Sequence, residues 1–151
     1  MTAAPLSPDQ TARQHWMGLL ARAKPQLLAT LLPDLPGHQI LRAPELGSVM
    51  IRGRAGATGT PFNLGEMTVT RCVVQLATGE VGHANVAGRD KAHATRAALV
   101  DALMQTAAAL GTQTTVLTPL AEDEAARKYT RAARAAATKV DFFTLVRGED
   151  Q

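Results

Sequence analysis

The sequence predicts an α+β fold, in which an antiparallel sheet of about four strands packs against N-terminal, central and C-terminal helices. Segments with helical apolar periodicity lie toward both ends of the chain. Short β-tolerant runs separated by turn signals fill its middle. The links between these runs are too short for crossover helices, so the strands should form an antiparallel meander.

The first helix has a clear start. Ser7 can cap it, Pro8 suits its first position, and Gln10 completes a capping box. An apolar stripe then follows at helical spacing, formed by Ala12, Trp16, Leu19, Leu20 and Ala23. We therefore expect this helix to pack one face on the core. A second, short helix is predicted for residues 25–32.

The strands are predicted for the middle of the chain. After a turn at residues 33–37, two short strands cover 38–43 and 48–55, with a turn between them. The Val- and Thr-rich segment 67–77 is the strongest strand, and a tight hairpin turn leads from it into the strand at 81–87.

Helices are predicted for the remainder. A long helix from about Asp90 to Leu110 has Gly111 just past its end, and Asp101 lies outside its apolar arc. A connector at 112–119, which includes an extended piece, leads into a charged, alanine-rich helix that runs to about Lys139. One face of that last helix is rich in basic residues, and acidic residues stand at its N-terminal end, as the helix dipole favours.

Length and composition predict a single domain over residues 1–151, with residues 1–7 as a flexible N-terminus. Hydrophobic residues make up 46% of the chain, but aromatic residues only 3%, so the core should consist of small side chains. Such a thin core favours completion by a partner, including a second copy in a homodimer. No signal peptide and no apolar stretch of membrane-spanning length is evident, which predicts a cytoplasmic protein without membrane contact.

The charge is modest. The chain contains 16 Lys and Arg residues and 13 acidic residues, which gives a net charge of +3. The basic residues are dispersed and aromatic residues are few, which disfavours a nucleic-acid-binding protein. The single cysteine, Cys72, excludes an internal disulfide and cannot ligate an iron–sulfur cluster. Its strand-like neighbours favour a small buried hydrophobe over a nucleophile.

Two basic segments are candidates for anion binding. The glycine-rich stretch 52–60 lacks the ending of a nucleotide-binding P-loop, and a hairpin loop with positive φ angles explains it better. Arg52 and Arg54 are two residues apart on a strand and so share a face, where they can hold phosphate or partner carboxylates, or simply be solvated.

The second basic segment, residues 88–93, lies where a strand ends and the long helix begins. Free backbone N–H groups beside Arg89 and Lys91 would form an anion site, with His93 and Arg96 as further phosphate or interface contacts. The alternative, which we favour, is that Asp90 caps the helix and His93 is a satisfied core or rim histidine.

No catalytic or metal-binding arrangement is evident. His15, His38 and His83 occur singly on different elements, without metal-ligand spacing. No nucleophile elbow or Cys/His arrangement is present either. We therefore assign no catalytic residue, no metal and no cofactor to this chain alone.

Several segments together resemble one family. They are Arg13-Gln14-His15-Trp16-Met17, Thr68-Val69-Thr70-Arg71, residues 88–94, residues 98–105, and the tail Val140 to Gly148. Over nearly its whole length the chain is similar to the PhnG family, subunits of the bacterial carbon–phosphorus (C–P) lyase system.

The resemblance implies a non-catalytic subunit of a core complex with PhnH, PhnI and PhnJ homologues. Together with PhnI, PhnH and PhnL, such a subunit is needed to make a ribose 1-phosphonate 5-triphosphate from ATP and a phosphonate, with release of adenine. MgATP would then be a substrate of the complex. The family assigns the nucleosidase chemistry to PhnI and the radical chemistry to PhnJ, so no catalytic residue carries over.

Two hypotheses follow. In the first, the chain docks on its partners, in part through the aromatic tail, with Phe142, Phe143 and Leu145 as candidate docking residues. In the second, Arg52, Arg54, Arg89 and Lys91 contribute a phosphate-binding surface to an active site shared between subunits.

Overall fold

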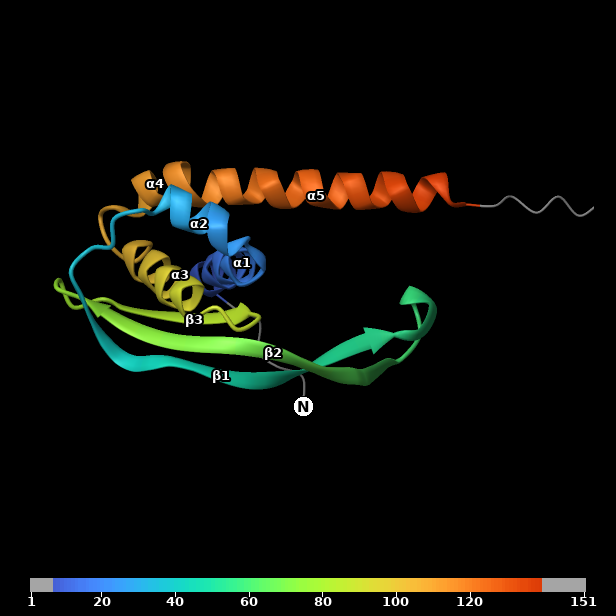
Figure 1. Cartoon of the computed structure of the whole chain (residues 1–151), viewed down its shortest axis with the longest axis horizontal. Helices are drawn as coiled ribbons and strands as arrows, with labels where there is room; N and C mark the ends of the chain where they lie inside the picture. Colours follow the sequence, from blue (N-terminus) through green and yellow to red (C-terminus); the bar gives the residue numbers. More distant parts are fainter. Residues whose placement is uncertain (1–6, 140–151) are drawn as a thin grey trace, which may run out of the picture.

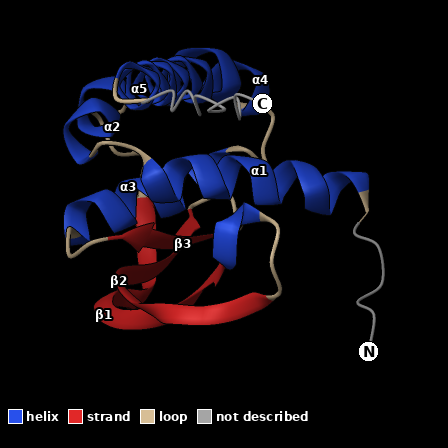
Figure 2. Cartoon of the chain, turned by 90° about the vertical axis from the view of Figure 1, so that its right-hand side faces the viewer, coloured by secondary structure: helices blue, strands red, loops and turns tan. Residues whose placement is uncertain are grey.

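The computed structural model describes residues 7–139. The predicted docking residues of the tail, Phe142, Phe143 and Leu145, lie outside the described part. The described chain has the expected α+β architecture, in three layers (Figures 1 and 2): an antiparallel sheet, helices α1 and α3 on one of its faces, and α2, α4 and α5 above them. No helix between residues 7 and 139 has the length and apolarity to span a membrane.

The sheet has three strands, β1 (His38–Arg54), β2 (Pro61–Leu76) and β3 (Val81–Ala87), in the order β1-β2-β3. All pairs are antiparallel, as predicted. The two strands expected at 38–43 and 48–55 are one continuous strand, so the prediction of about four strands counted one too many. The predicted turn contains Pro44, which the strand accommodates because β1 is an edge strand and its register shifts between Arg42 and Glu45.

The hairpin of β1 and β2 extends well beyond β3. The pairing of β3 with β2 ends at Val69, so residues 47–68 form a two-stranded ribbon, which we call the hairpin arm. The arm curves back toward α5 (Figure 1). The glycine-rich stretch closes its tip, where Gly56 has a φ of 58°. This confirms the interpretation of these glycines as a hairpin loop.

The first helices begin as the sequence predicts. In α1 (Pro8–Arg22), the Ser7 hydroxyl accepts a hydrogen bond from the backbone N–H of Gln10, and the Gln10 side chain accepts one from the backbone N–H of Ser7. Helix α2 (Pro25–Leu31) follows directly. Helix α3 (Lys91–Leu103) is capped by Asp90, whose carboxylate accepts from the backbone N–H of His93 at 2.9 Å.

The second half is more broken than predicted. Helix α3 ends at Leu103, and α4 (Ala109–Thr112), a π-helical turn (Gln113–Leu117) and α5 (Thr118–Ala137) follow almost without interruption. A helix through Leu110, a stop at Gly111 and an extended connector were therefore wrong. The Thr106 hydroxyl accepts a hydrogen bond from the backbone N–H of Ala108. In a continued helix, that N–H would donate to a backbone carbonyl, so the side chain competes with the helix at this point.

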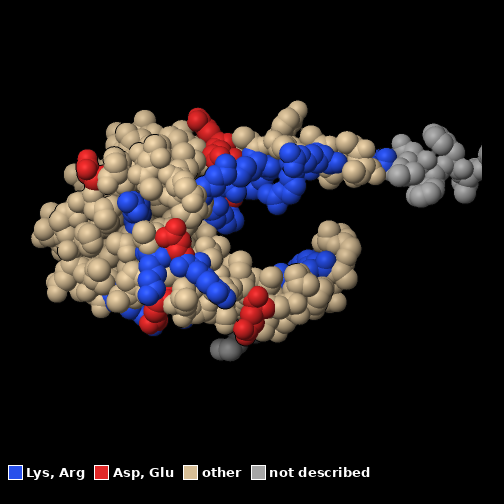
Figure 3. Space-filling view, viewed as in Figure 1, with Lys and Arg blue, Asp and Glu red and all other residues tan. Residues whose placement is uncertain are grey.

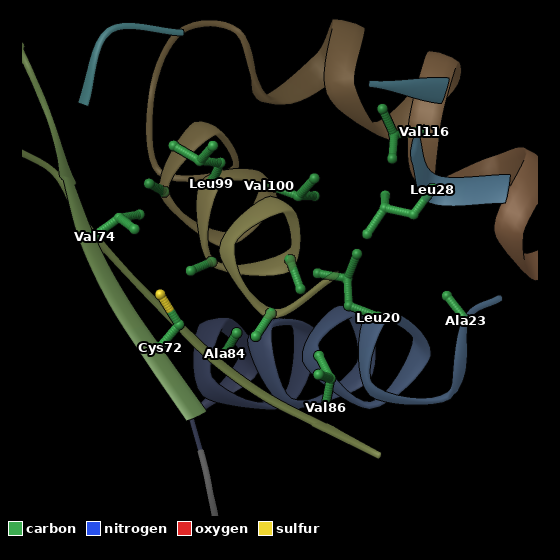
Figure 4. Close-up of a cluster of buried hydrophobic side chains, with 14 of the residues drawn as sticks. Leu20, Ala23, Leu28, Cys72, Val74, Ala84, Val86, Leu99, Val100 and Val116 are labelled. Carbon is green, nitrogen blue, oxygen red and sulfur yellow. The ribbon is translucent and has the colours of Figure 1, made fainter. Parts of the chain in front are cut away.

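The core lies between the sheet and α3, with α1 and α2 closing it (Figure 4). Its side chains are mostly small, as composition predicted, and Cys72 is among them, fully buried. Burial raises the pKa of the Cys72 thiol, as expected for a packing residue. A β-carbon at Gly82 would lie 1.9 Å from the Ala98 carbonyl oxygen, so α3 approaches β3 at backbone distance there.

Candidate functional site

A basic cleft opens between α5 and the hairpin arm. Figure 3 shows the hollow, with Lys and Arg side chains gathered on the side of α5 that faces the arm and on the inner side of the arm. We call this hollow the basic cleft. Its two walls come from segments far apart in the sequence, and α1 and α3 lie between α5 and the three-stranded part of the sheet (Figure 1).

The α5 wall carries a row of arginines. Arg127, Arg131 and Arg134 are four and three residues apart, the spacing that places side chains in one line along a helix. Together with Lys24, which follows α1, they line one surface hollow. The nearby Lys128 lies off this row and pairs with Glu124 at 3.4 Å.

At the inner end of the row, each positive charge has a carboxylate partner. The Lys24 ammonium and the Arg127 guanidinium each lie 2.7 Å from a carboxylate oxygen of Asp123. Arg22 pairs with Glu124, also at 2.7 Å. The hydrogen bond from Lys24 lowers the pKa of Asp123, and that from Arg22 lowers the pKa of Glu124. These pairs tie the end of α1 to the start of α5 and fix the direction of α5.

At the outer end, the positive charges are unbalanced. Arg131 and Arg134 are exposed, and within residues 7–139 their side chains have no hydrogen-bond or ion-pair partner. Helix α5 has one buried residue, Leu120, close to its start. Most of its 20 residues therefore project from the domain with little packing against it.

The arm wall contains the predicted Arg52 and Arg54. Leu46 pairs with Thr70 and Met50 with Glu66, and paired residues share a face of the sheet. This is the face of β2 that holds Cys72 against Thr95 of α3. Arg52 and Arg54 continue the alternation of Leu46 and Met50 along β1, and they are the basic residues of the arm.

Both arginines are exposed, and Arg54 donates a hydrogen bond to the Gly59 carbonyl at 3.1 Å across the tip. Leu46 and Met50, on the same face, are each 52% exposed. The arm therefore offers apolar side chains at its base and two guanidinium groups toward its tip.

The predicted segment around Arg89 and Lys91 lies at the base of the arm. The Gly88 backbone N–H donates to the Thr68 carbonyl at 3.0 Å, and the Thr70 hydroxyl donates to the Gly88 carbonyl at 2.8 Å. Arg89 and Lys91 are exposed beside this junction. The fold thus brings four of the six predicted basic contacts, Arg52, Arg54, Arg89 and Lys91, to the arm and its base.

The other two predicted contacts, His93 and Arg96, belong to the helical layer. His93 is 2% exposed, and its Nε2 lies 3.1 Å from the Leu20 carbonyl oxygen, while its Nδ1 has no partner within residues 7–139. Burial lowers the pKa of His93. Arg96 donates to the Leu32 carbonyl at 3.4 Å. Each of these contacts joins α3 to the chain of α1 and α2.

The sequence analysis missed the most connected polar residue. Asp101, expected outside the apolar arc of α3, is fully buried. Its carboxylate accepts two hydrogen bonds from Arg13 (3.1 and 2.7 Å), one from the Trp16 indole (2.9 Å) and one from the His83 backbone N–H (2.9 Å). The only sequence signal was that Arg13 and Trp16 stand three apart on α1.

The basic row of α5 was noticed as a basic helix face but was not named as a site. Its signal was the spacing of Arg127, Arg131 and Arg134, and only the fold shows that this face turns toward the hairpin arm (Figure 3). Within the described residues, no group of three or more His, Cys, Asp or Glu side chains is placed to hold a metal ion. The basic side chains of the cleft are of the kind that pairs with carboxylate or phosphate groups.

Comparison with known proteins shows a family to which the chain is similar and a curated relative. Residues 11–148 match the family described as phosphonate metabolism protein PhnG. The chain is also 46% identical over 155 aligned positions to a protein of Rhizobium meliloti (strain 1021), described as alpha-D-ribose 1-methylphosphonate 5-triphosphate synthase subunit PhnG. That alignment covers 99% of each chain.

Proposed function

The chain belongs to the PhnG family, and from this membership we propose that it is a non-catalytic subunit of a C–P lyase core complex. With its partners, it would be needed to make alpha-D-ribose 1-phosphonate 5-triphosphate from ATP and an alkylphosphonate, with release of adenine. The observation that carries this proposal is the 46% identity to a synthase subunit over 99% of both chains.

The form of the described domain supports a docking role. A two-stranded ribbon is marginally stable by itself, and the hairpin arm has no third strand. A projecting helix draws little stability from tertiary packing, and α5 has a single buried residue. Exposed Met50, Phe62 and Leu64, with Leu46 next to the arm, add apolar surface. Contacts with other subunits would stabilise both projections.

The proposed partners are PhnH, PhnI and PhnJ homologues in the core complex, with PhnL also needed for the reaction. Their chemistry places the assembly in the cytoplasm, where ATP is available. MgATP is then a substrate of the assembly, and the catalytic groups come from the partner subunits.

Reconstitution tests the proposal. The partner subunits are mixed with MgATP and methylphosphonate, with and without this chain, and released adenine is measured. We expect adenine release to depend on the chain. The rate should rise with the concentration of the chain until that concentration equals the concentration of the partner subunits. An equal rate of adenine release without the chain would contradict the proposal.

A second function is favoured by the placement of Arg89 and Lys91. These exposed cations stand at the N-terminus of α3, at the base of the arm whose outer part carries Arg52 and Arg54. They would contribute phosphate contacts to an active site shared with a partner. In the assembled complex, Arg89→Glu should then abolish adenine release without loss of assembly, whereas Arg42→Glu on β1, away from the arm, should leave it unchanged. Loss of assembly with Arg89→Glu would instead support docking alone.

A further inference from the structure

We propose that the basic cleft is a clamp for an acidic, amphipathic helical segment of a partner subunit. This inference rests on the proposed function and gives its docking role a specific surface and occupant. The segment would place its acidic side chains against Arg131 and Arg134 and its apolar side against Leu46 and Met50.

The basic cleft carries unpaired positive charge at its outer end. Asp123 and Glu124 form ion pairs with Lys24, Arg127 and Arg22 at the inner end of the cleft. Farther out, Arg131 and Arg134 have no partner among residues 7–139, and neither has the side chain of Arg52 on the opposite wall. Unpaired guanidinium groups therefore stand on both walls of the basic cleft (Figure 3), and a carboxylate-bearing occupant would pair with them bidentately.

The positive charges on the α5 wall are regularly spaced. Arg127, Arg131 and Arg134 follow the helical repeat, so their guanidinium groups form a line parallel to the axis of α5. An α-helix lying along α5 with carboxylates every three or four residues matches that line. At 20 residues, α5 is about 30 Å long, which provides room for several turns of an occupant.

The wall opposite α5, formed by β1, also carries apolar side chains. Leu46 and Met50 lie on the helix-facing side of β1 and are about half exposed. Isolated phosphate or a triphosphate would gain nothing from these side chains. A helix with one acidic and one apolar face would cover them, as in other helix-in-groove complexes.

The positions of the aromatic side chains favour a protein segment over a nucleic acid as the occupant of the cleft. Single-stranded nucleic acids bind by stacking bases on aromatic side chains. Tyr129, the aromatic residue of α5, stands two positions from Arg127 and Arg131 and so on the other side of the helix, 78% exposed. Phe62, the aromatic residue of the arm, pairs with Gly53 and so lies on the face opposite to Arg52 and Arg54.

The test uses the whole complex, purified through a tag on this chain. One variant neutralises two cations of the cleft, Arg131→Gln with Arg134→Gln. The control, Ala125→Glu with Ala132→Glu, changes the net charge by the same amount on the far side of α5, where both alanines are exposed. Partner subunits retained per tagged chain are measured at about 0.15 M salt and at higher salt. A photo-reactive residue in place of Arg134 then identifies what lies in the cleft.

We expect the cleft variant to retain about tenfold less of one partner subunit, and the control to retain as much as the wild type. The cross-linked peptide should come from that partner and carry acidic residues at helical spacing. Three results would overturn the clamp: equal retention in both variants, a cross-link to a second copy of this chain or to its own tail, or loss of nucleotide binding without loss of any partner. Recovery of the wild-type chain with no partner at all would instead contradict the proposed function itself.

Discussion

Asp101 joins three elements through one carboxylate. It accepts hydrogen bonds from Arg13 and Trp16 of α1 and from the backbone of His83 in β3, while its own position is in α3. The hydrogen bond to Asp101 raises the pKa of Arg13, which keeps the guanidinium group charged. Four accepted hydrogen bonds compensate the cost of burying the charge. α1 is therefore held to the sheet by a polar contact as well as by packing.

Replacement of Asp101 by Asn should destabilise the domain by about 3 kcal/mol, because the ion pair with Arg13 is lost and an amide cannot accept from every donor. Urea unfolding of the purified chain measures this change. The matched control is Asp34→Asn, at an exposed turn, which should change the free energy of unfolding by less than about 0.5 kcal/mol. A similar value for both variants would show that the Asp101 network does not stabilise the fold.

His93 makes the stability of the domain depend on pH. Burial lowers its pKa below the value of about 6.5 that it has in the unfolded chain. At a pH between these two pKa values, His93 is protonated in the unfolded chain but neutral in the folded chain, so protonation favours unfolding. The contribution of neutral His93 is therefore complete above pH 6.5 and is lost as pH falls below it.

We expect the free energy of unfolding to fall between pH 7 and pH 5, and His93→Gln to flatten part of that slope, because Gln can still donate to the Leu20 carbonyl but does not titrate. The measurement is urea unfolding at several pH values. His15→Gln, at an exposed position of α1, serves as the control and should keep the wild-type slope. An unchanged slope in His93→Gln would contradict the role of His93.

At the residue scale, sequence patterns predicted local contacts well. The capping box of Ser7 and Gln10, the cap at Asp90 and the burial of Cys72 all depend on near neighbours and were found as expected. The partners of Asp101 were missed, because they lie 18 to 88 residues away in the chain. Helical periodicity predicts that a polar residue such as Asp101 is exposed. It carries no information about a distant cation that would allow the residue to be buried.

At the scale of elements, the contact of β3 with α3 depends on the absence of a side chain. A β-carbon on Gly82 would lie 1.9 Å from the Ala98 carbonyl oxygen and 2.7 Å from the Ala102 backbone nitrogen. Both neighbours are backbone atoms of a buried helix, so neither can shift without moving the helix. The small residues Ala98 and Ala102 allow the same close approach from the side of α3.

Gly82→Ala should therefore destabilise the domain by about 3 kcal/mol or more, because α3 must shift off the sheet. Thermal unfolding followed by circular dichroism measures the effect. Gly65→Ala in the arm is the control, since no atom lies within 4 Å of its added β-carbon and its φ is not positive. A melting temperature for Gly82→Ala equal to that of the control would contradict backbone-distance packing here.

Element boundaries were predicted less well than element types. Pro44 and Gly47 resemble a turn in sequence, but a bulged edge strand tolerates both, so β1 continues through them. In the second half, apolar residues continue past Leu103 although the helix breaks there, and Gly111 lies inside α4. Such breaks depend on side-chain hydrogen bonds, such as that of Thr106, which periodicity does not register.

At the scale of the whole molecule, a packed domain carries two projections that form the walls of one cleft (Figure 3). Sequence spacing predicted the shared face of Arg52 and Arg54 and the basic face of α5. It did not predict that these two surfaces oppose each other, because their relation depends on the length of the hairpin arm and on the ion pairs of Lys24 and Arg22 with α5. The cleft is a property of the tertiary structure.

The exposure of α5 leads to a prediction for proteolysis. In the isolated chain, the part of α5 beyond Arg127 should open locally, and trypsin should cut first after Arg131 and Arg134. Arg13, held by the buried Asp101, is the internal control and should be cut late. In the purified complex, cleavage at Arg131 and Arg134 should slow by at least about tenfold. Equal rates in the two samples would show that no partner covers this part of α5.

Native mass spectrometry of what co-purifies with this chain shows whether it works as one subunit of an assembly. The tagged chain would be isolated from its native cells, grown with a phosphonate as the phosphorus source. The account predicts one complex that contains the chain together with PhnH, PhnI and PhnJ homologues in fixed ratio. A tagged chain that appears only at the mass of its monomer, 15.9 kDa plus the tag, would contradict it.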